Sequence, residues 1–363
     1  MLERPWSAAE RAFAASSVVA FPRDLVRWAV LAPSRHNTQP WLFEVEGEEV
    51  RIHADAARAL PVADPYGREQ LVACGAAVAN LRLAAVHHGH ATSLEVLAGQ
   101  RRDGLTARVR LEERASPSEE EEALFGAIPL RRTHRLPLDG REPPEGLLGA
   151  LAREARREGA FLRPVEAHER AAVAELVAEG DRRQWSDPRF RSEVSAWTRS
   201  NGSTRRDGLF GFSRGLGDAA SLLEPWRVRF GDGAGEAERD RHRVRGTRAL
   251  LVLSTPGDEP SDWFAAGCAL QRVLLRATAA RLSASFFSQP LAFPDLRRAL
   301  AGVTGLTGKP QVLFRLGYSL EVRAAPRREL REVMRRDAPA PTPPPVQALV
   351  RVGSQPPAPV NPG

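Results

Sequence analysis

Cysteine is scarce in this sequence of 363 residues, which contains two, Cys74 and Cys268. Both lie in apolar stretches with helical spacing, so the sequence excludes a disulfide framework and a thiolate metal site. No run of roughly eighteen apolar residues is present, and no membrane-spanning segment is expected. Residues 1–17 carry charged side chains and lack an uninterrupted apolar core, which argues against a signal peptide. We therefore expect a protein of the reducing cytoplasm.

Lysine is almost absent as well, since Lys309 is the one lysine in a sequence whose lysine and arginine total is 52. The formal net charge of +7 and the pI near 10.5 admit a nucleic-acid-binding protein. The arginines are nevertheless interspersed with acidic and mixed stretches, such as 119–122 and 153–157, instead of forming one stripe. Nucleic-acid binding is therefore kept only as a remote alternative. The positive excess instead favours anionic cofactors and substrates.

Two parts of the chain show the same order of expected elements, and with 42% hydrophobic residues the chain can bury one large core or two ordinary ones. In the first part the pattern predicts a short helix, a strand pair, a long helix and a further strand, over residues 22–31, 41–45, 49–53, 71–88 and 106–111. In the second part it predicts a strand, a long helix and a strand over residues 249–254, 264–281 and 311–317. Gly75 and Gly267 occupy matching places in the two long helices. A duplicated α+β unit is the simplest account.

An insertion of about residues 181–243 interrupts the second part. It contains three tryptophans, among them Trp197, and a glycine-rich run over 208–217 with Phe210 and Phe212. Aromatic side chains on a glycine-jointed segment suit a lid, and a helical insert with an irregular loop is the alternative. The expected organisation is an N-terminal extension over 1–21, halves over 22–125 and 126–336, and a disordered proline-rich tail over 337–363.

A polar loop between two prolines precedes the first expected strand. Ser34, His36, Asn37 and Gln39 are enclosed by Pro33 and Pro40, just before Trp41. Prolines hold such a loop extended and stiff, so its polar side chains are aimed before a ligand arrives. The composition predicts a wall for a flat ligand rich in heteroatoms.

Three other segments contain side chains that are candidates for ligand binding. The first places guanidinium groups and a hydroxyl within five residues, a set suited to a phosphate dianion. Its members are Arg131, Arg132, Thr133 and Arg135. A basic pair near the end of the chain, Arg327 and Arg328, supplies further cations. The last segment follows the second long helix and contains Ser285, Phe286, Phe287, Ser288 and Gln289.

Together these motifs resemble those of the FMN-binding nitroreductases. In that family a Pro-Ser-x-x-Asn-x-Gln-Pro-Trp loop meets the isoalloxazine edge, an Arg-Arg-Ser-type motif and a C-terminal basic pair grip the phosphate, and a third segment passes near flavin N5. Ordinary members are dimers in which each FMN takes its loop from one subunit and its arginine motif from the other. Here the loop occurs only in the first half and the arginine motif only in the second, which has Glu158–Val165 where a loop would stand. That distribution is similar to the Acg-like branch, single chains that imitate the dimer and hold one FMN under a lid.

The resemblance covers roughly residues 22–335 and implies an α+β, nitroreductase-like fold with two similar halves forming an intramolecular pseudo-dimer and carrying an insertion. It implies FMN as cofactor, NAD(P)H as electron donor, a small nitro, quinone or similar acceptor, and a monomer, with the flavin carrying the redox chemistry. It assigns FMN contacts to the loop, arginine, C-terminal and 285–289 residues named above. Because Phe286 and Phe287 are bulky for an open flavin face, two readings remain: a reductase of restricted activity, or an FMN sequestration or storage protein.

Three rival motifs are weaker. Gly211–Gly215 matches the serine-hydrolase elbow around Ser213 but lacks the preceding strand. His87, His88 and His90 stand at a helix end without a suitably spaced carboxylate, so no metal site is expected. The segment 302–309 has the wrong spacing for a phosphate-binding loop.

Overall fold

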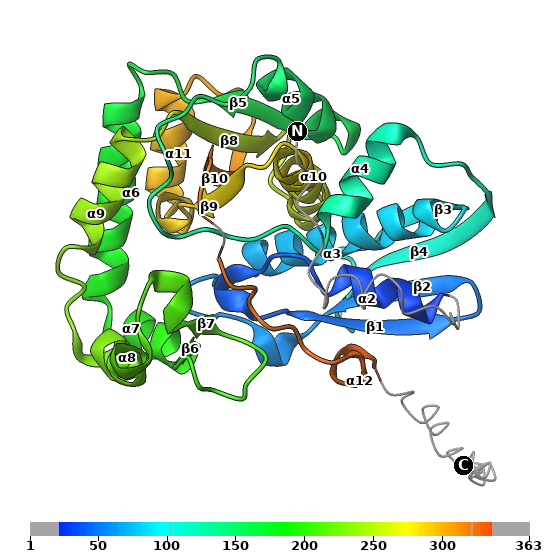
Figure 1. Ribbon diagram of the computed structural model, residues 1–363, viewed down its shortest axis with the longest axis horizontal. Coiled ribbons are helices and arrows are strands. Elements are labelled where there is room, and N and C mark those ends of the chain that lie inside the picture. Colours follow the sequence, from blue (N-terminus) through cyan, green and yellow to red (C-terminus); the bar gives the residue numbers. More distant parts are fainter. Residues whose placement is uncertain (1–21, 102, 321, 336–363) are drawn as a thin grey trace, which may run out of the picture.

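The computed structural model describes residues 22–101, 103–320 and 322–335. The expected N-terminal extension and proline-rich tail lie outside the described residues. Within them the fold consists of two four-stranded sheets, with two long helices between them and a helical excursion on one side (Figure 1).

The first sheet is antiparallel throughout, in the order β1-β2-β4-β3. Its strands are β1 (Trp41–Glu46), β2 (Glu49–Ala54), β3 (His90–Val96) and β4 (Leu105–Arg114). The long helix α3 (Arg68–His87) joins β2 to β3. The short α2 (Val26–Ala29) precedes β1, and α4 (Glu119–Ala127) follows β4 with Ser118 as a capping-box N-cap.

The second sheet repeats this plan in the order β5-β8-β10-β9, again antiparallel. Its strands are β5 (Phe161–Pro164), β8 (Ala249–Thr255), β9 (Ser283–Phe286) and β10 (Lys309–Gly317). Helix α10 (Pro260–Ala279) joins β8 to β9 as α3 joins β2 to β3, and α5 (Leu147–Arg157) precedes β5 as α2 precedes β1. Two helices follow in this half, α11 (Pro294–Val303) and α12 (Leu330–Val333). The expected α+β fold with two similar halves is confirmed.

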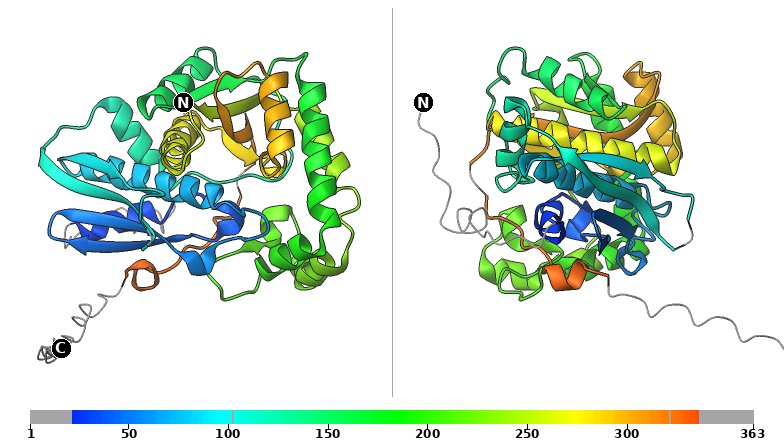
Figure 2. Two further views of the ribbon diagram at one scale, coloured as in Figure 1. Left: turned by 180° about the vertical axis from the view of Figure 1, so that it is seen from behind. Right: turned by 90° about the vertical axis from the view of Figure 1, so that its right-hand side faces the viewer.

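Helices α3 and α10 pack against each other between the two sheets (Figure 2). Their contact is reciprocal: a Cβ added to Gly75 would lie 2.0 Å from the carbonyl oxygen of Phe264, and one added to Gly267 would lie 2.0 Å from that of Val72. Only glycine permits this separation, because a Cβ would overlap the facing backbone. The paired glycines of the sequence therefore mark the closest approach of the two halves.

A long excursion separates β5 from β8, where the first half has a two-residue turn at Gly47 and Glu48. It contains α6 (Arg170–Ser186), α7 (Pro188–Ala196), β6 (Thr198–Arg199), β7 (Leu209–Phe210), α8 (Asp218–Phe230) and α9 (Glu236–Arg245). The excursion therefore begins before the expected position 181. It lies on one side of the molecule, at the left of Figure 1.

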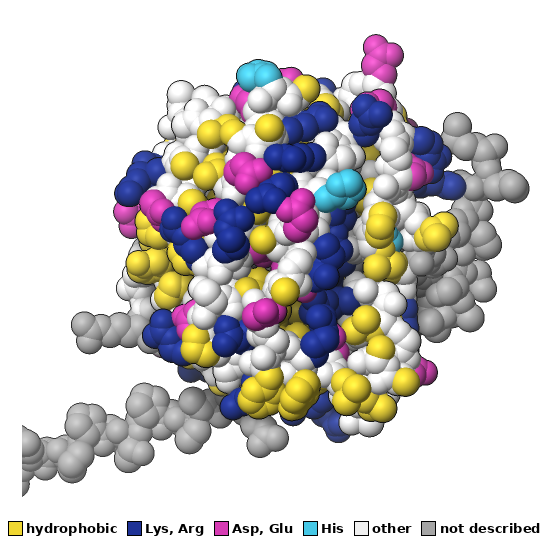
Figure 3. Space-filling model, turned by 90° about the vertical axis from the view of Figure 1, so that its left-hand side faces the viewer, with side chains coloured by type: hydrophobic (Ala, Val, Ile, Leu, Met, Phe, Trp, Pro, Cys, Tyr) yellow, Lys and Arg dark blue, Asp and Glu magenta, His cyan; other side chains and the backbone are white. Residues whose placement is uncertain are grey.

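The outer surface of the excursion carries an apolar patch. Figure 3 shows arginines in a band down the middle of this face and apolar side chains along its lower edge. Helix α8 exposes four large apolar side chains, Leu222, Leu223, Trp226 and Phe230. Trp226 is 65% exposed and contacts Phe230, so it lies outside the interior of the insertion.

Helix α3 is, within the described part of the chain, the one helix whose length and composition would allow it to cross a membrane. In this fold 72% of its apolar window is buried, against the first sheet and α10. It therefore has the surroundings of a core helix.

Candidate functional site

A cavity of about 490 Å³ lies between the two halves and the excursion. Its walls come from residues 33–36, α3, residues 133–135, residues 285–289 and the helices α6 and α9. A smaller hollow of about 60 Å³ adjoins it and shares Pro33, Ser34, Thr133 and Arg135 among its lining residues. The larger volume falls in the range of ordinary small-molecule and cofactor sites.

The proline-enclosed loop between α2 and β1 is held in an unfavourable backbone conformation. Three of its side-chain-bearing residues have positive φ angles: 50° at His36, 54° at Asn37 and 51° at Gln39. The Ser34 hydroxyl steadies the turn by accepting a hydrogen bond from the Gln39 amide over 2.9 Å. Such strain costs of order 1–3 kcal/mol per residue and persists where the surrounding structure enforces it, commonly at ligand sites.

His36 lines the larger cavity as a neutral imidazole. Burial lowers the pKa of this side chain well below its usual value, and the guanidinium groups of Arg35, Arg135 and Arg214 lower it further. Its Nε2 atom is buried and has no hydrogen-bond partner among the described residues. A ligand in the cavity would supply the missing partner.

The arginine motif is positioned by β9. Thr133 forms an isolated bridge with Ala284, and the amide of His134 donates to the Ala284 carbonyl over 2.8 Å. This places Thr133 and Arg135 beside Ser285 on the cavity wall. The segment 131–135 and the segment after β9, separate in the sequence, thus form one wall.

Arg131, Arg135 and Arg327 form a positively charged cluster around the smaller hollow, where Arg132 also contributes lining. Burial lowers the pKa of each of the three, and neighbouring arginines lower it further, to about 10 for Arg135 and about 10 for Arg327. No carboxylate among the described residues forms an ion pair with any of the three. Arg131 is buried and the other two are partly buried, so guanidinium groups that repel one another here, unpaired among the described residues, form a candidate site for an anion.

The end of β9 and the segment that follows it contribute the third wall. Ser285, Phe286, Ser288 and Gln289 line the larger cavity. Phe287 lines it too but is 1% exposed and belongs to the hydrophobic core. The Phe287 amide donates to the Leu313 carbonyl over 2.9 Å, which fixes the segment to β10.

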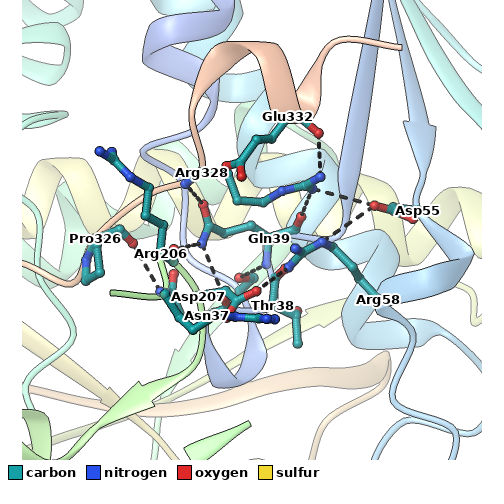
Figure 4. A network of polar contacts seen from close by, with 12 residues as sticks. Asn37, Thr38, Gln39, Asp55, Arg58, Arg206, Asp207, Pro326, Arg328 and Glu332 are labelled. Atoms are coloured by element: carbon teal, nitrogen blue, oxygen red, sulfur yellow. Dashed lines mark hydrogen bonds and ion pairs between the residues drawn. The ribbon is translucent and has the colours of Figure 1, made fainter. Parts of the chain in front are cut away.

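Gln39 and Arg328 line neither hollow, although the sequence places them with the cofactor contacts. The polar groups of both side chains instead form hydrogen bonds within a buried network (Figure 4). The Gln39 side chain donates to the Arg206 carbonyl over 2.7 Å and accepts from the Arg328 amide over 2.7 Å, while the Arg328 guanidinium donates to the carbonyls of Gln39, Trp41 and Glu332. These two residues fasten the loop to the excursion and to the C-terminal segment.

The excursion closes one side of both hollows. Leu209, Arg214 and Leu216 line the larger cavity, and Phe210 and Phe212 line the smaller one. Trp197, expected among the covering aromatic residues, instead packs in a separate cluster with Leu60 and Phe190 and has Arg58 over its ring. Contrary to the expectation, Trp197 therefore lines neither hollow.

In the structure, the side chains of the serine-hydrolase-like and histidine motifs make ordinary structural contacts. Ser213 lies in a 3-10 turn after the two-residue strand β7, and its hydroxyl donates to the Phe210 carbonyl over 2.7 Å. The His87 ring stacks on Phe125 and contacts Glu122 over 2.9 Å. Across residues 22–101, 103–320 and 322–335 no cluster of three or more potential metal ligands is present.

Sequence reasoning missed the wall made by α6 and α9, which includes Asp181, Gln184 and Asp240. Asp181 and Gln184 lie three residues apart and so share one face of α6. That spacing indicates a polar helix face inside the insertion. That this face lines a cavity follows only from the packing of α9 against α6.

The fold and site define an α+β protein of two similar halves with a cavity between them that adjoins a cluster of arginines. The chain belongs to the nitroreductase family. It is 30% identical over 319 residues to the Mycobacterium tuberculosis H37Rv protein named "Putative NAD(P)H nitroreductase Rv3131", covering 86% of this chain and 90% of that protein. It is 29% identical over 322 residues to the H37Rv protein "Putative NAD(P)H nitroreductase acg", covering 86% and 94%. The resemblance inferred from the motifs is confirmed.

Solved structures give looser likenesses. A nitroreductase from Anabaena variabilis covers 85% of this chain and 91% of its own, with a TM-score of 0.48 and 11% identity. The FMN-dependent nitroreductase NfnB from Mycobacterium smegmatis, solved with NADPH, covers 60% of this chain and 99% of its own, with a TM-score of 0.38 and 18% identity. No protein-family model matches the sequence.

Proposed function

We propose that the chain binds FMN in the cavity between its halves and acts as an NAD(P)H-dependent oxidoreductase whose access is restricted by the excursion. The single observation that carries the proposal is the cluster of the buried Arg131 with the partly buried Arg135 and Arg327, which forms no ion pair with a carboxylate of the described residues. A phosphate dianion would supply that charge and accept bidentate hydrogen bonds. The residues present therefore fit FMN.

The proposed contacts divide between phosphate and ring. Arg131, Arg132, Thr133, Arg135 and Arg327 would hold the phosphate. The flavin ring would be held by Ser34, His36, Asn37 and residues 285–289, with Gln39 and Arg328 supporting from behind. When bound, FMN would supply two-electron transfer between NAD(P)H and a small nitro, quinone or similar acceptor.

The role of the protein would be to bind, orient and shield. The neutral His36 ring would offer a hydrogen bond without adding charge next to the cluster. The relatives' names, which specify NAD(P)H and nitroreductase, support the donor and the acceptor class. We propose a cytoplasmic monomer with halves over 22–125 and 126–336 and no role in nucleic-acid binding.

FMN sequestration or storage remains the second candidate. The specific observation in its favour is the buried network that fastens the excursion to the loop through Gln39 and Arg206. If NAD(P)H cannot bleach the bound flavin at any useful rate, storage is the better description. Anaerobic mixing of the flavin-loaded protein with NADH or NADPH, followed by absorbance, separates the two candidates.

The proposed site predicts one FMN per chain. Within the described part of the chain, the first half has an eleven-residue stretch, 30–40, between α2 and β1, whereas in the second half α5 and β5 are joined by residues 158–160 alone. Heat release of flavin followed by absorbance is expected to give one equivalent, and gel filtration should give the mass of one chain. Two equivalents would contradict the single-site proposal, and a freshly purified protein without flavin absorbance that also takes up no added FMN would contradict FMN binding.

Asp207→Asn is expected to loosen the excursion. The Asp207 carboxylate, 3% exposed, pairs with Arg58 over 3.1 Å, Arg199 over 3.1 Å and Arg205 over 3.4 Å. Its neutralisation leaves three guanidinium groups facing one another, so FMN should dissociate about tenfold faster, a barrier change of about 1.4 kcal/mol.

The matched control is Glu238→Gln, which removes an exposed carboxylate from the same excursion. Dissociation is followed by the rise of free-flavin fluorescence after dilution. Equal rates for the wild-type protein and Asp207→Asn, with the fold retained, would show that this network does not restrain the cofactor.

A further inference from the structure

The wall formed by α6 and α9 contains polar side chains that the proposed FMN contacts do not use, and Gln289, which is one of those contacts, links two of them. Asp181 and Gln184 come from α6, Asp240 from α9, and Gln289 from the segment after β9; all four line the larger cavity, and none lines the smaller hollow with the arginine cluster. Helices α6 and α9 lie side by side in both views of the fold (Figures 1 and 2). The group is therefore built at a tertiary contact, away from the anion site.

One amide links the two carboxyl groups. The Gln289 Nε2 atom donates to Asp181 Oδ1 over 3.0 Å and to Asp240 Oδ2 over 2.7 Å. Both donor hydrogens of that amide are thus used. The remaining oxygen of Asp181, Oδ2, is buried and has no hydrogen-bond partner among the described residues.

Gln184 supplies a second unsatisfied group. Both residues are buried, since Gln184 is 6% exposed and Asp181 is 3% exposed. The Gln184 Nε2 atom has no hydrogen-bond partner in the described part of the chain. The two residues lie three apart on one helix face. Buried polar atoms of native proteins are nearly always satisfied, so a partner from the cavity is expected.

Among the described residues, no cation forms an ion pair with Asp181, and Arg243 acts on it only from a distance. On α9, Arg243 pairs with Asp240 over 2.7 Å, and Glu236 is held by Arg239 and by Arg214 over 2.9 Å. On α11, Asp295 pairs with Arg183, which belongs to α6 but does not line the cavity. Two carboxyl groups that share one amide and one arginine favour a single negative charge.

The Asp181 proton is therefore retained near neutrality. Burial, followed by the nearby Asp240 and Glu236, raises the pKa of Asp181 to about 8 despite the lowering effects of Gln289 and Arg243. Because Oδ1 already accepts from Gln289, the proton belongs on Oδ2. Asp181 Oδ2 and Gln184 Nε2 are then two donors without an acceptor.

We propose that Asp181 and Gln184 form the oxygen-binding end of an acceptor subsite, which donates hydrogen bonds to a carbonyl or nitro oxygen of an uncharged ligand. This inference rests on the proposed function, since it places the electron acceptor in the same cavity as FMN. The carboxylates of Asp240 and Glu236 disfavour an anionic ligand on this wall. A cationic ligand would instead require Asp181 to be ionised.

The test is the binding of nitrobenzene, which is uncharged at every pH used, to the oxidised flavin-loaded protein without NAD(P)H. Calorimetry gives the Kd without any turnover. Between about pH 6 and about pH 7 the Kd should be constant, and it should rise about tenfold as Asp181 ionises through about pH 8, the equivalent of one lost hydrogen bond of about 1 kcal/mol or slightly more.

Three variants test the contribution of the Asp181 donor. Asp181→Asn keeps a donor but cannot ionise, so its Kd should not depend on pH in this range. Asp181→Ala should bind about tenfold more weakly at about pH 7. Glu179→Gln, which removes a carboxylate from the same helix outside the cavity, should match the wild-type protein in both Kd and pH profile. FMN content and melting temperature of each variant establish that it is folded and loaded.

Several outcomes would overturn the inference. One is a pH step that persists in Asp181→Asn, and another is an unchanged Kd in a folded Asp181→Ala. Tighter binding of benzylamine with rising pH through Asp181 would assign the subsite to cations. The proposed function fails separately, through absence of flavin. Because calorimetry needs no flavin, the Asp181-dependent step can still be measured in that case, and its presence would support the ligand subsite while its absence would overturn it.

Discussion

Arg131→Ala and Arg135→Ala are each expected to release FMN from a protein that remains folded. Each side chain would contribute a charge-assisted phosphate contact, and its loss should cost about 1.5–3 kcal/mol, or about ten- to a hundredfold in affinity. The measurement is flavin retained per chain after dialysis, followed by titration of the emptied protein with FMN. Arg110→Ala, which removes an exposed arginine of β4, is the matched control and should retain FMN.

In the flavin-free protein, by contrast, removing one of these arginines is not expected to lower the melting temperature. The folded protein holds Arg131 among Arg132, Arg135 and Arg327, and this environment lowers its pKa. A lowered arginine pKa means that the charged side chain destabilises the folded state relative to the unfolded state. This destabilisation is present throughout the pH range below the folded-state pKa. Flavin-free Arg131→Ala should therefore melt no lower than the flavin-free wild-type protein. Full FMN retention in both variants would show that the phosphate lies elsewhere.

Gly75→Ala and Gly267→Ala are expected to be among the most destabilising single-methyl changes in the chain. At both positions the new Cβ would meet backbone of the facing helix, which cannot rotate away as a side chain can. Relief requires α3 and α10 to separate along the interface of the two halves. The free energy of unfolding should fall by about 3 kcal/mol or more, beyond the usual range for overpacking, with a marked loss of melting temperature or soluble yield.

Gly126→Ala is the matched control, since it lies in α4 and a Cβ there meets no atom within 4 Å. Alanine should leave stability unchanged or raise it by about 0.5–1 kcal/mol, because glycine is unfavourable inside a helix. Chemical denaturation of the three variants gives the comparison. A Gly75→Ala protein as stable as Gly126→Ala would show that the helices do not approach as described.

The elements predicted correctly from the sequence are those with strong internal patterns. Strand β8 is an apolar run buried along its whole length, and α3 and α10 show the small residues that a close helix contact needs. The strands that escaped notice, β3, β5 and β9, all lie at the edges of their sheets. An edge strand with one partner buries less of its surface, so its side chains do not follow a clear alternation. β5 has four residues and ends in Pro164.

The candidate site shows the same division between local and tertiary information. That loop residues such as Ser34 and His36 line a cavity could be predicted, since proline and polar composition act locally. Whether Gln39 faces the ligand or the excursion could not, because its partner Arg206 is 167 residues away. The same holds for Asp181, whose surroundings are set by Asp240 and Gln289 on other elements.

The excursion between β5 and β8 has a consequence for how this protein can vary. In a dimer of identical chains, a segment added at a hairpin appears twice, and every substitution alters both sites. Here the corresponding hairpin of the first half keeps its two-residue turn at Gly47 and Glu48, while the second half alone carries the cover. Each half can therefore be engineered for a single task, with loop changes introduced in one and cover changes in the other, and no altered residue is forced upon a second copy.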